Sequence, residues 1–203
     1  MHIQELSIPD TYEITPRQHP DDRGIFLEWY RFDRLAEVVG HPISLAQANT
    51  SVSKKGTVRG IHFADIPPSQ AKYVTAVHGA VMDFVVDIRV GSPTFGQWDS
   101  VLLDDVDRKA IYISEGIGHC FVALTDKATV SYLVTSTFNA EREHGITPLD
   151  REIGLDFGLP SDELLLSPKD LAAPTLAEAH AAGLLPDWAS ARSFYDNLNK
   201  GAR

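Results

Sequence analysis

Short runs of alternating apolar and polar residues fill the first 157 positions of this chain. The runs are rich in Val, Ile, Thr and aromatic residues, and Gly, Pro and Asp turns separate them, which is typical of an all-β sandwich or barrel. Clear strand candidates cover residues 24–30, 44–53, 72–79, 80–90, 98–104, 109–114, 119–125 and 128–136. Because this many short strands with tight turns suit a jelly roll, we expect a mostly β jelly-roll barrel.

The pattern changes after about residue 160, where helix signals replace strand signals. Side chains that cap helix N-termini and glycines that end helices recur in this part of the chain. The signals are Ser167 followed by Pro168 and Asp170, Thr175 with Glu178, the stop at Gly183, and Asp187 ahead of a last helix that runs through Asn199. We therefore expect a single domain over residues 1–203, with the jelly roll in 1–157 and a helical C-terminal cover in 158–203.

Composition and charge narrow the function classes. Cys120 is the single cysteine, so an internal disulfide is excluded, and the chain has neither a signal-peptide start nor an apolar run of membrane length. A cytoplasmic location is therefore expected. The formal charge of -10 opposes binding to nucleic acid or anionic lipid. It leaves room for a small anionic ligand, because a few convergent Arg and Lys side chains can hold a diphosphate.

The segment 58–74 places Arg59, His62 and Lys72 among apolar neighbours. Charged groups are costly to bury unless they are paired or used, so the segment indicates a site that holds an anion or moves a proton. Alternation along a regular strand would place Arg59 and His62 on opposite faces. If both serve one site, we expect irregular pairing at Gly60, because glycine in a strand often marks a bulge. The alternative is a core histidine and two solvated surface charges.

Three further side chains have both a structural and a functional interpretation. In residues 128–136 the apolar face includes Tyr132, which therefore points into the barrel either as a satisfied core tyrosine or as a proton donor. His119 follows a glycine-rich turn and is either polar surface or part of a site. Asp170 lies where the start of a helix already explains an acid.

Metal and nucleotide-binding motifs are absent from the sequence. The eight histidines, at positions 2, 19, 41, 62, 78, 119, 144 and 180, include no H-x-H pair of the kind with which jelly rolls often hold a metal. No phosphate-loop motif, G-x-G-x-x-G or G-x-S-x-G occurs. A metal site is therefore not expected.

Seven segments, in chain order, carry a wider resemblance. They are DDRGIFLEWY (21–30), QANTSVS (47–53), VRGIHF (58–63), PPSQAKYV (67–74), VVDIRVGSPTFGQW (85–98), YISEGIGHCFVAL (112–124) and SYLVTSTFNAEREHGI (131–146). Together they resemble the dTDP-4-dehydrorhamnose 3,5-epimerase family over nearly the whole chain. GLLPDW near the C-terminus looks like its actinobacterial branch, which makes rhamnose and antibiotic deoxysugars. The resemblance implies a cupin-type jelly roll, usually a homodimer, that acts on a dTDP-4-keto-6-deoxyhexose without metal or organic cofactor.

The resemblance also implies roles for individual residues. His62 would be the general base, Asp170 the carboxylate that orients it, and Tyr132 the proton donor on the other face of the sugar. Lys72, with Arg59, would stabilise the developing oxyanion. Phe138 stands where a tyrosine often stacks on thymine, so it keeps the aromatic face and loses the hydroxyl. The remaining substrate-binding positions are Arg23, Phe26, Glu28, Gln47, Asn49, Arg59, His119 and Glu143.

The chemistry of the implied substrate agrees with these roles. A keto group at C4 acidifies the hydrogens on C3 and C5, so removal of either one gives an enolate with its charge on O4. A neutral histidine can take the proton if a fixed cation meets that oxygen, and reprotonation from the opposite face inverts the carbon. Three alternatives stay open: a 3-epimerase that acts at C3 only, a ketoisomerase of related deoxysugar pathways, and a non-catalytic cupin that binds sugar nucleotides.

Overall fold

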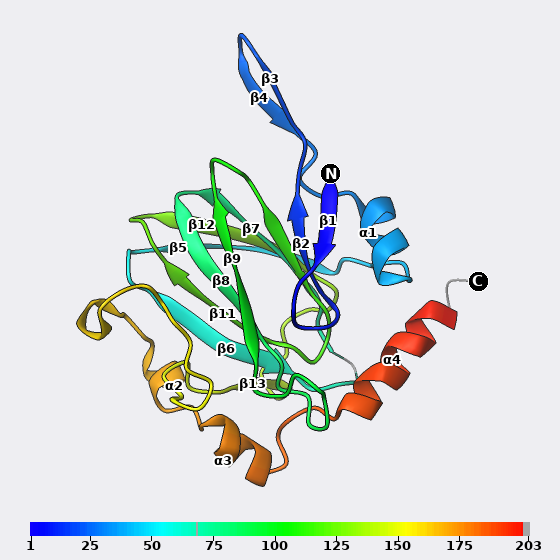
Figure 1. The fold of residues 1–203 in the computed structure, drawn as a ribbon, viewed down its shortest axis with the longest axis vertical. Helices are drawn as coiled ribbons and strands as arrows, with labels where there is room; N and C mark the ends of the chain where they lie inside the picture. Colours follow the sequence, from blue (N-terminus) through cyan, green and yellow to red (C-terminus); the bar gives the residue numbers. More distant parts are fainter. Residues whose placement is uncertain (68, 201–203) are drawn as a thin grey trace.

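The computed structural model describes residues 1–67 and 69–200, and its strands form two facing antiparallel sheets (Figure 1). The larger sheet has the order β1 (His2–Glu5), β2 (Thr11–Thr15), β10 (Ala110–Ile113), β7 (Lys72–His78), β12 (Ala128–Val134) and β5 (Gln47–Ser53). The smaller has the order β13 (Glu143–Gly145), β6 (Val58–Ala64), β11 (Gly118–Ala123), β8 (Ala80–Val86) and β9 (Trp98–Asp104). The expected mostly β jelly-roll fold is confirmed.

Outside the two sheets lie a hairpin and several helices. The hairpin of β3 (Gln18–Asp21) and β4 (Gly24–Leu27) projects from the barrel at the top of Figure 1. The helices are α1 (Phe32–Val39), the 3-10 turn η1 (Ser161–Glu163), α2 (Pro168–Leu171), α3 (Leu176–Ala181) and α4 (Trp188–Lys200). Within the described residues, no helix combines the length and apolar character that crossing a membrane requires.

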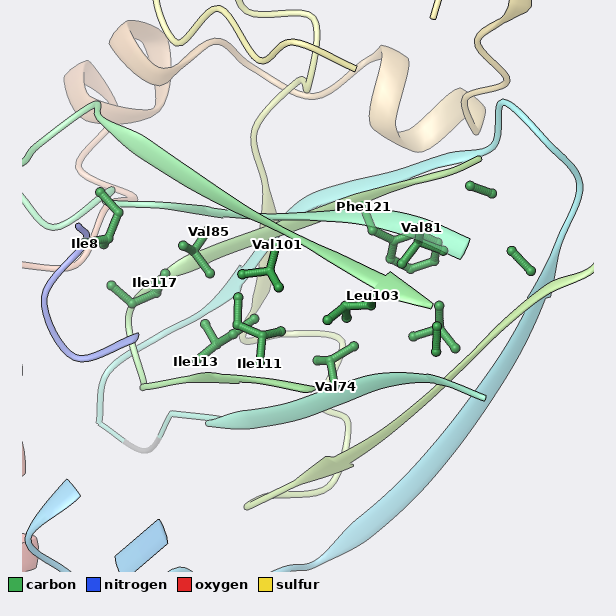
Figure 2. Packing of buried hydrophobic residues seen from close by; sticks show 14 residues of the cluster. Ile8, Val74, Val81, Val85, Val101, Leu103, Ile111, Ile113, Ile117 and Phe121 are labelled. Atoms are coloured by element: carbon green, nitrogen blue, oxygen red, sulfur yellow. The ribbon is translucent and has the colours of Figure 1, made fainter. Parts of the chain in front are cut away.

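Aliphatic side chains fill the space between the two sheets (Figure 2). Their alternation follows the sequence pattern: Ala128 and Val130 of β12 are fully buried in this cluster, and Tyr132 packs against it. Val81 and Val85 of β8 meet them from the facing sheet. Burial of apolar side chains is the main stabilising contribution here, at about 25 cal/mol for each Å² removed from water. The predicted inward direction of Tyr132 is confirmed.

The C-terminal segment covers the outer face of the smaller sheet. Phe84, which alternates with the inward residues of β8, packs with Phe157, Leu176 and Ala179 in a second apolar cluster. The three helix starts predicted in this segment, at Ser167, Thr175 and Asp187, are all present. The Ser167 side chain accepts a hydrogen bond from the backbone of α2, and Thr175 forms a capping box on α3. The division at residue 157 stays a prediction.

Helix α1 was not predicted, and the strand expected over residues 24–30 ends at Leu27. The helix begins without a side-chain cap at Arg31, so the usual start signal is absent. Its end carries a signal, because Gly40 adopts the left-handed conformation with φ of 85°. Leu35 is the buried residue that fastens α1 to the outer face of the larger sheet.

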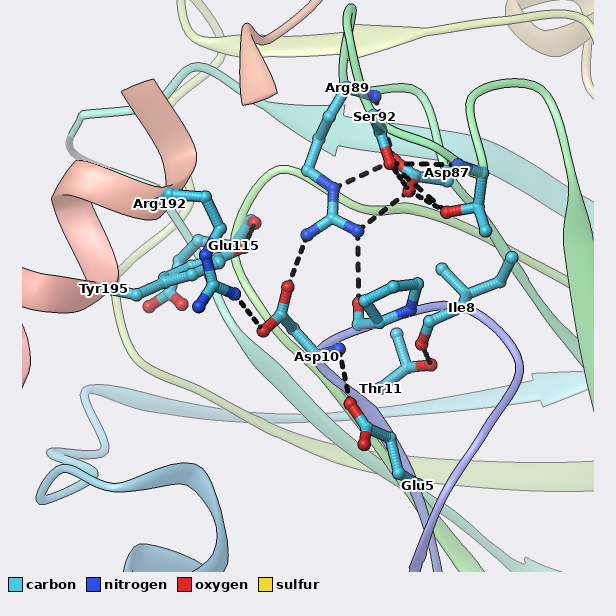
Figure 3. Close-up of polar contacts among 12 residues, drawn as sticks. Glu5, Ile8, Asp10, Thr11, Asp87, Arg89, Ser92, Glu115, Arg192 and Tyr195 are labelled. Atoms are coloured by element: carbon cyan, nitrogen blue, oxygen red, sulfur yellow. Dashed lines mark hydrogen bonds and ion pairs between the residues drawn. The ribbon is translucent and has the colours of Figure 1, made fainter. Parts of the chain in front are cut away.

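A buried polar cluster connects α4 to the first turn of the chain (Figure 3). The Arg89 side chain is fully buried and forms ion pairs with Asp87 at 2.9 Å and with Asp10 at 2.8 Å. Arg192 of α4 pairs with the other oxygen of Asp10 at 2.8 Å. Trp188 lies under the Arg89 guanidinium, 4.4 Å from the ring centroid. These contacts fix the C-terminal helix against the barrel.

Candidate active site

One cavity collects most of the side chains that the sequence singled out. It has a volume of about 260 Å³ and opens between the two sheets, next to the segment that follows β12. Strands β5, β6, β7, β12 and β13 each contribute to its wall. Its lining residues are Gln47, Asn49, His62, Gln70, Lys72, Tyr132, Phe138 and Glu143.

The two chemically active candidates reach this cavity from opposite sheets. His62 lies on β6 of the smaller sheet, and Tyr132 lies on β12 of the larger one. Both line the same cavity, so a small ring bound there has the imidazole on one side and the phenol on the other. The geometry suits removal of a proton from one face and its return from the other.

A β-bulge at Gly60 sets the direction of His62. His62 faces His119 across the β6–β11 pair, whereas Arg59 faces Phe121, so β6 advances three residues while β11 advances two. Gly60 has φ of 125°, and a side chain there would collide with the backbone oxygen of His119. The irregular pairing expected at this glycine is therefore confirmed. Glycine is required because it alone fits both the backbone angle and the space.

Asp170 holds the imidazole of His62. The distance between His62 Nε2 and Asp170 Oδ1 is 2.7 Å, and Ser167 Oγ donates to the other carboxylate oxygen at 2.8 Å. Partial burial raises the pKa of Asp170, but the hydrogen bonds from His62 and Ser167 outweigh it and leave the pKa below its usual value. Asp170 therefore accepts a hydrogen bond from the N–H at Nε2, and Nδ1 is the ring nitrogen left to take a proton in the reaction.

Lys72 belongs to a buried charged group that includes a residue the sequence analysis missed. Asp83, on β8, is fully buried, and its oxygens lie 2.9 and 3.0 Å from His119 Nε2. Burial lowers the pKa of the Lys72 ammonium, and the carboxylates of Glu143 and Asp83 partly offset this. Burial also raises the pKa of Asp83, against the influence of His119 and Lys72. The sequence signal that could have revealed this group is Asp83 itself, an acidic residue inside the otherwise apolar run VMDFVV (81–86).

Tyr132 is suited to donate a proton. Burial and the nearby Glu143 carboxylate raise the pKa of its phenol, while Arg59 acts in the opposite direction. Arg59 also donates from Nε to Ser53 Oγ at 3.2 Å. A phenol with a raised pKa stays protonated at neutral pH and so remains available as an acid.

Five predicted binding residues do not line this cavity. Arg59 on β6 and His119 on β11 belong to strands of the smaller sheet, whereas the other three lie on the β3–β4 hairpin or just after it. Arg23, at the turn of the β3–β4 hairpin, pairs with Asp21. Phe26 on β4 is 69% exposed, and Glu28 pairs with Arg31. The structure does not bring these three side chains to His62 within one chain, and their role in binding stays a prediction. In the described part of the chain, no cluster of His, Cys, Asp and Glu has three members placed to hold a metal ion.

Comparison with known proteins agrees with this geometry. The family model described as dTDP-4-dehydrorhamnose 3,5-epimerase matches residues 5–178. The chain belongs to this family. The resemblance drawn from the sequence is therefore confirmed, and the protein is an enzyme of the isomerase class, a carbohydrate epimerase.

Individual relatives give a mixed picture of the carbons involved. A dTDP-4-dehydrorhamnose 3-epimerase from Streptomyces niveus is 55% identical, over 95% of this chain and 92% of its own. A dTDP-4-dehydrorhamnose 3,5-epimerase from Mycolicibacterium smegmatis is 54% identical, over 98% of each chain. The solved structure of an epimerase from Mycobacterium tuberculosis superimposes with a TM-score of 0.95 at 49% identity, covering 98% of this chain and 100% of that one.

Proposed function

We propose that this epimerase inverts both C3 and C5 of dTDP-4-keto-6-deoxyglucose. The observation that carries the proposal is the placement of His62 and Tyr132 on opposite sheets around one cavity. Inversion needs a base on one face of the sugar and an acid on the other, whereas simple binding needs neither. The intact set of His62, Lys72 and Tyr132 favours epimerisation over ketoisomerisation.

The reaction proceeds through an enolate. His62 Nδ1 takes the hydrogen of C3 as a proton, the C3–H electron pair forms the C3–C4 double bond, and the carbonyl pair moves to O4. The Lys72 ammonium, with Arg59, stabilises the negative oxygen. Tyr132 then gives its proton to C3 from the opposite face, and the carbonyl forms again. Proton exchange with solvent returns both side chains to their starting states, and the sequence repeats at C5.

A 3-epimerase is the second candidate. The 55% identical protein from Streptomyces niveus carries that name, while the 54% identical protein from Mycolicibacterium smegmatis is named as a 3,5-epimerase. Identity therefore does not separate the two. Inversion at C5 needs an acid that reaches the face opposite His62 after the ring has rearranged, and Tyr132 is our candidate for that acid. Hydrogen exchange at C5 decides between the two functions.

Substrate binding and assembly form the second part of the proposal. Gln47, Asn49, His119, Phe138 and Glu143 hold the sugar nucleotide at the cavity, and two copies of the chain form a homodimer. The projecting hairpin is an argument for the homodimer. It carries Arg23 and Phe26 outside the barrel, where a second copy of the chain can contact them (Figure 1). A cytoplasmic location stays a prediction, as does the absence of nucleic-acid and membrane partners.

Two variants test the proposed chemistry in heavy water. His62→Ala should abolish deuterium uptake at C3 and at C5, because it removes the base, and such losses are commonly about 10²- to 10⁴-fold. Tyr132→Phe should lose inversion at C5 more severely than proton removal at C3, since His62 remains to abstract. Proton NMR distinguishes the two carbons. Exchange by His62→Ala at the wild-type rate would refute the assignment of the base.

A further inference from the structure

The segment 135–142 connects β12 to β13 and places an aromatic ring at the cavity. Its residue Phe138 lines the 260 Å³ cavity and also an adjoining one of about 170 Å³, yet it is 63% exposed. An exposed ring is not held by packing on all sides. Its position therefore depends on how the backbone of the segment is fixed.

Two glutamine side chains hold that backbone. Gln70 donates from Nε2 to the carbonyl oxygen of Ser136 at 2.9 Å. The backbone N–H of Phe138 donates to Gln47 Oε1 at 3.3 Å, and the amide of Gln47 is itself oriented by Asn49 at 2.6 Å. The Gln70 contact is the shorter of the two bonds to the segment, so it is the stronger constraint.

The start of the segment is tied to the same strand end that carries Gln70. Ala71 donates its N–H to Thr135 Oγ1 at 2.9 Å and accepts from the N–H of Thr135 at 3.2 Å. Lys72 follows directly as the first residue of β7. The position of Phe138 is thereby coupled to the strand that presents the oxyanion-stabilising lysine.

We propose that Gln70 is a positioning residue that fixes Phe138 for binding of the nucleotide part of the substrate. The inference rests on the proposed function, and it adds a residue to which neither the sequence nor the family resemblance gave a role. Gln70 acts through Ser136 on Phe138, and the family resemblance gives this ring the role of stacking on the base of the nucleotide, not of contacting the reacting carbons. Loss of the Gln70–Ser136 hydrogen bond therefore weakens binding of the ground state and of the transition state by the same amount, which raises KM and leaves kcat unchanged.

The test uses Gln70→Glu, which keeps the shape of the side chain and replaces its donor by a carboxylate oxygen. KM, and the Kd for dTDP alone, should rise about three- to tenfold, the range expected for one lost hydrogen bond, with kcat within about twofold. Gln70→Met removes the donor without adding charge and should act in the same direction. Gln97→Glu is the matched control, because it makes the same charge change at an exposed position with no side-chain hydrogen bond among the described residues.

Two further measurements separate positioning from direct contact with the substrate. In a Phe138→Ala background, Gln70→Glu should have little added effect on Kd, because the ring through which it acts is gone. Hydrogen exchange of the 135–142 peptide should be faster in Gln70→Met than in the wild type. Full additivity, or unchanged exchange with unchanged Kd, would overturn the inference. A wild-type protein that binds dTDP but exchanges no sugar hydrogen would overturn the proposed function, and it would leave the role of Gln70 in nucleotide binding unaffected.

Discussion

Replacing Asp170 by Asn should slow catalysis while preserving the helix that carries the residue. The variant keeps the size of the side chain and the backbone N–H that donates to Ser167 Oγ at 3.1 Å, so the helix cap survives. It loses the negative charge of the carboxylate whose Oδ1 accepts the hydrogen bond from His62 Nε2, at an N–O distance of 2.7 Å. A hydrogen bond to a charged group is worth about 1.5 to 3 kcal/mol, and about 1.4 kcal/mol is tenfold in rate. We therefore expect kcat to fall about 10- to 100-fold.

Steady-state kinetics and thermal melting, measured on the same preparations, check this prediction. Thr175→Ala is the matched control, since it removes the cap of the neighbouring α3 and should cost about 1 kcal/mol of stability with little effect on kcat. Asp170→Asn should differ from it by a large fall in kcat, whatever its own loss of stability at neutral pH. Near wild-type kcat combined with a melting temperature lowered as in Thr175→Ala would show that Asp170 only serves the helix.

The pH dependence of stability adds an independent check on the same pair. The pKa of Asp170 is lowered in the folded protein, so its contribution to stability is present above the usual aspartate pKa and is lost as the pH falls through the folded value. The difference in melting temperature between the wild type and Asp170→Asn should therefore narrow below about pH 4. A difference that stays constant from pH 3 to pH 7 would contradict the stabilisation of a charged Asp170 by its hydrogen bonds.

Three other variants have definite expected outcomes. Asp83→Asn removes a carboxylate that raises the pKa of Lys72, so the alkaline limb of the kcat/KM profile should move to lower pH; an unmoved limb would exclude this coupling. Burial raises the pKa of Glu115, whose Oε2 has no partner among the described residues, so its charged form costs stability as the pH rises above the usual glutamate pKa. Glu115→Gln should therefore stabilise the fold by about 1 to 3 kcal/mol at pH 8 and by nothing at pH 4, as read by chemical denaturation. Arg23→Ala should raise KM more than it lowers kcat, because a diphosphate contact is uniform between ground and transition states; an unchanged KM with a much lower kcat would contradict its binding role.

Strand periodicity predicted much of the fold because the two sheets bury one face of each strand between them. The alternation in β12 placed Tyr132 on the inner face, and the structure has it there. Gly60 marked the bulge that turns His62, since no other residue fits that backbone. Both predictions rest on local rules that long-range packing does not override.

Long-range contacts could not be worked out from local pattern. His62 and Asp170 are 108 positions apart, and only the family resemblance paired them before the structure did. Helix α1 was missed because Arg31 supplies no cap, and Gly40 alone is a weak signal. Asp83 was passed over because its neighbours form an ordinary buried strand, although a charge in that setting needs a partner. Gln70 donates a hydrogen bond to the backbone carbonyl of Ser136, and a contact to the backbone of a distant segment leaves no signal in the pattern of side chains.

Incubating the wild-type enzyme with dTDP-4-keto-6-deoxyglucose in heavy water tests the central claim most directly. In the proposed mechanism, each proton that His62 removes is lost to solvent, and each proton that Tyr132 returns comes from solvent. Proton NMR should therefore show deuterium at both C3 and C5, with inverted configuration at each carbon. Deuterium at C3 but never at C5 would contradict the double inversion and leave a 3-epimerase, and no deuterium at either carbon would exclude the proposed proton transfer altogether.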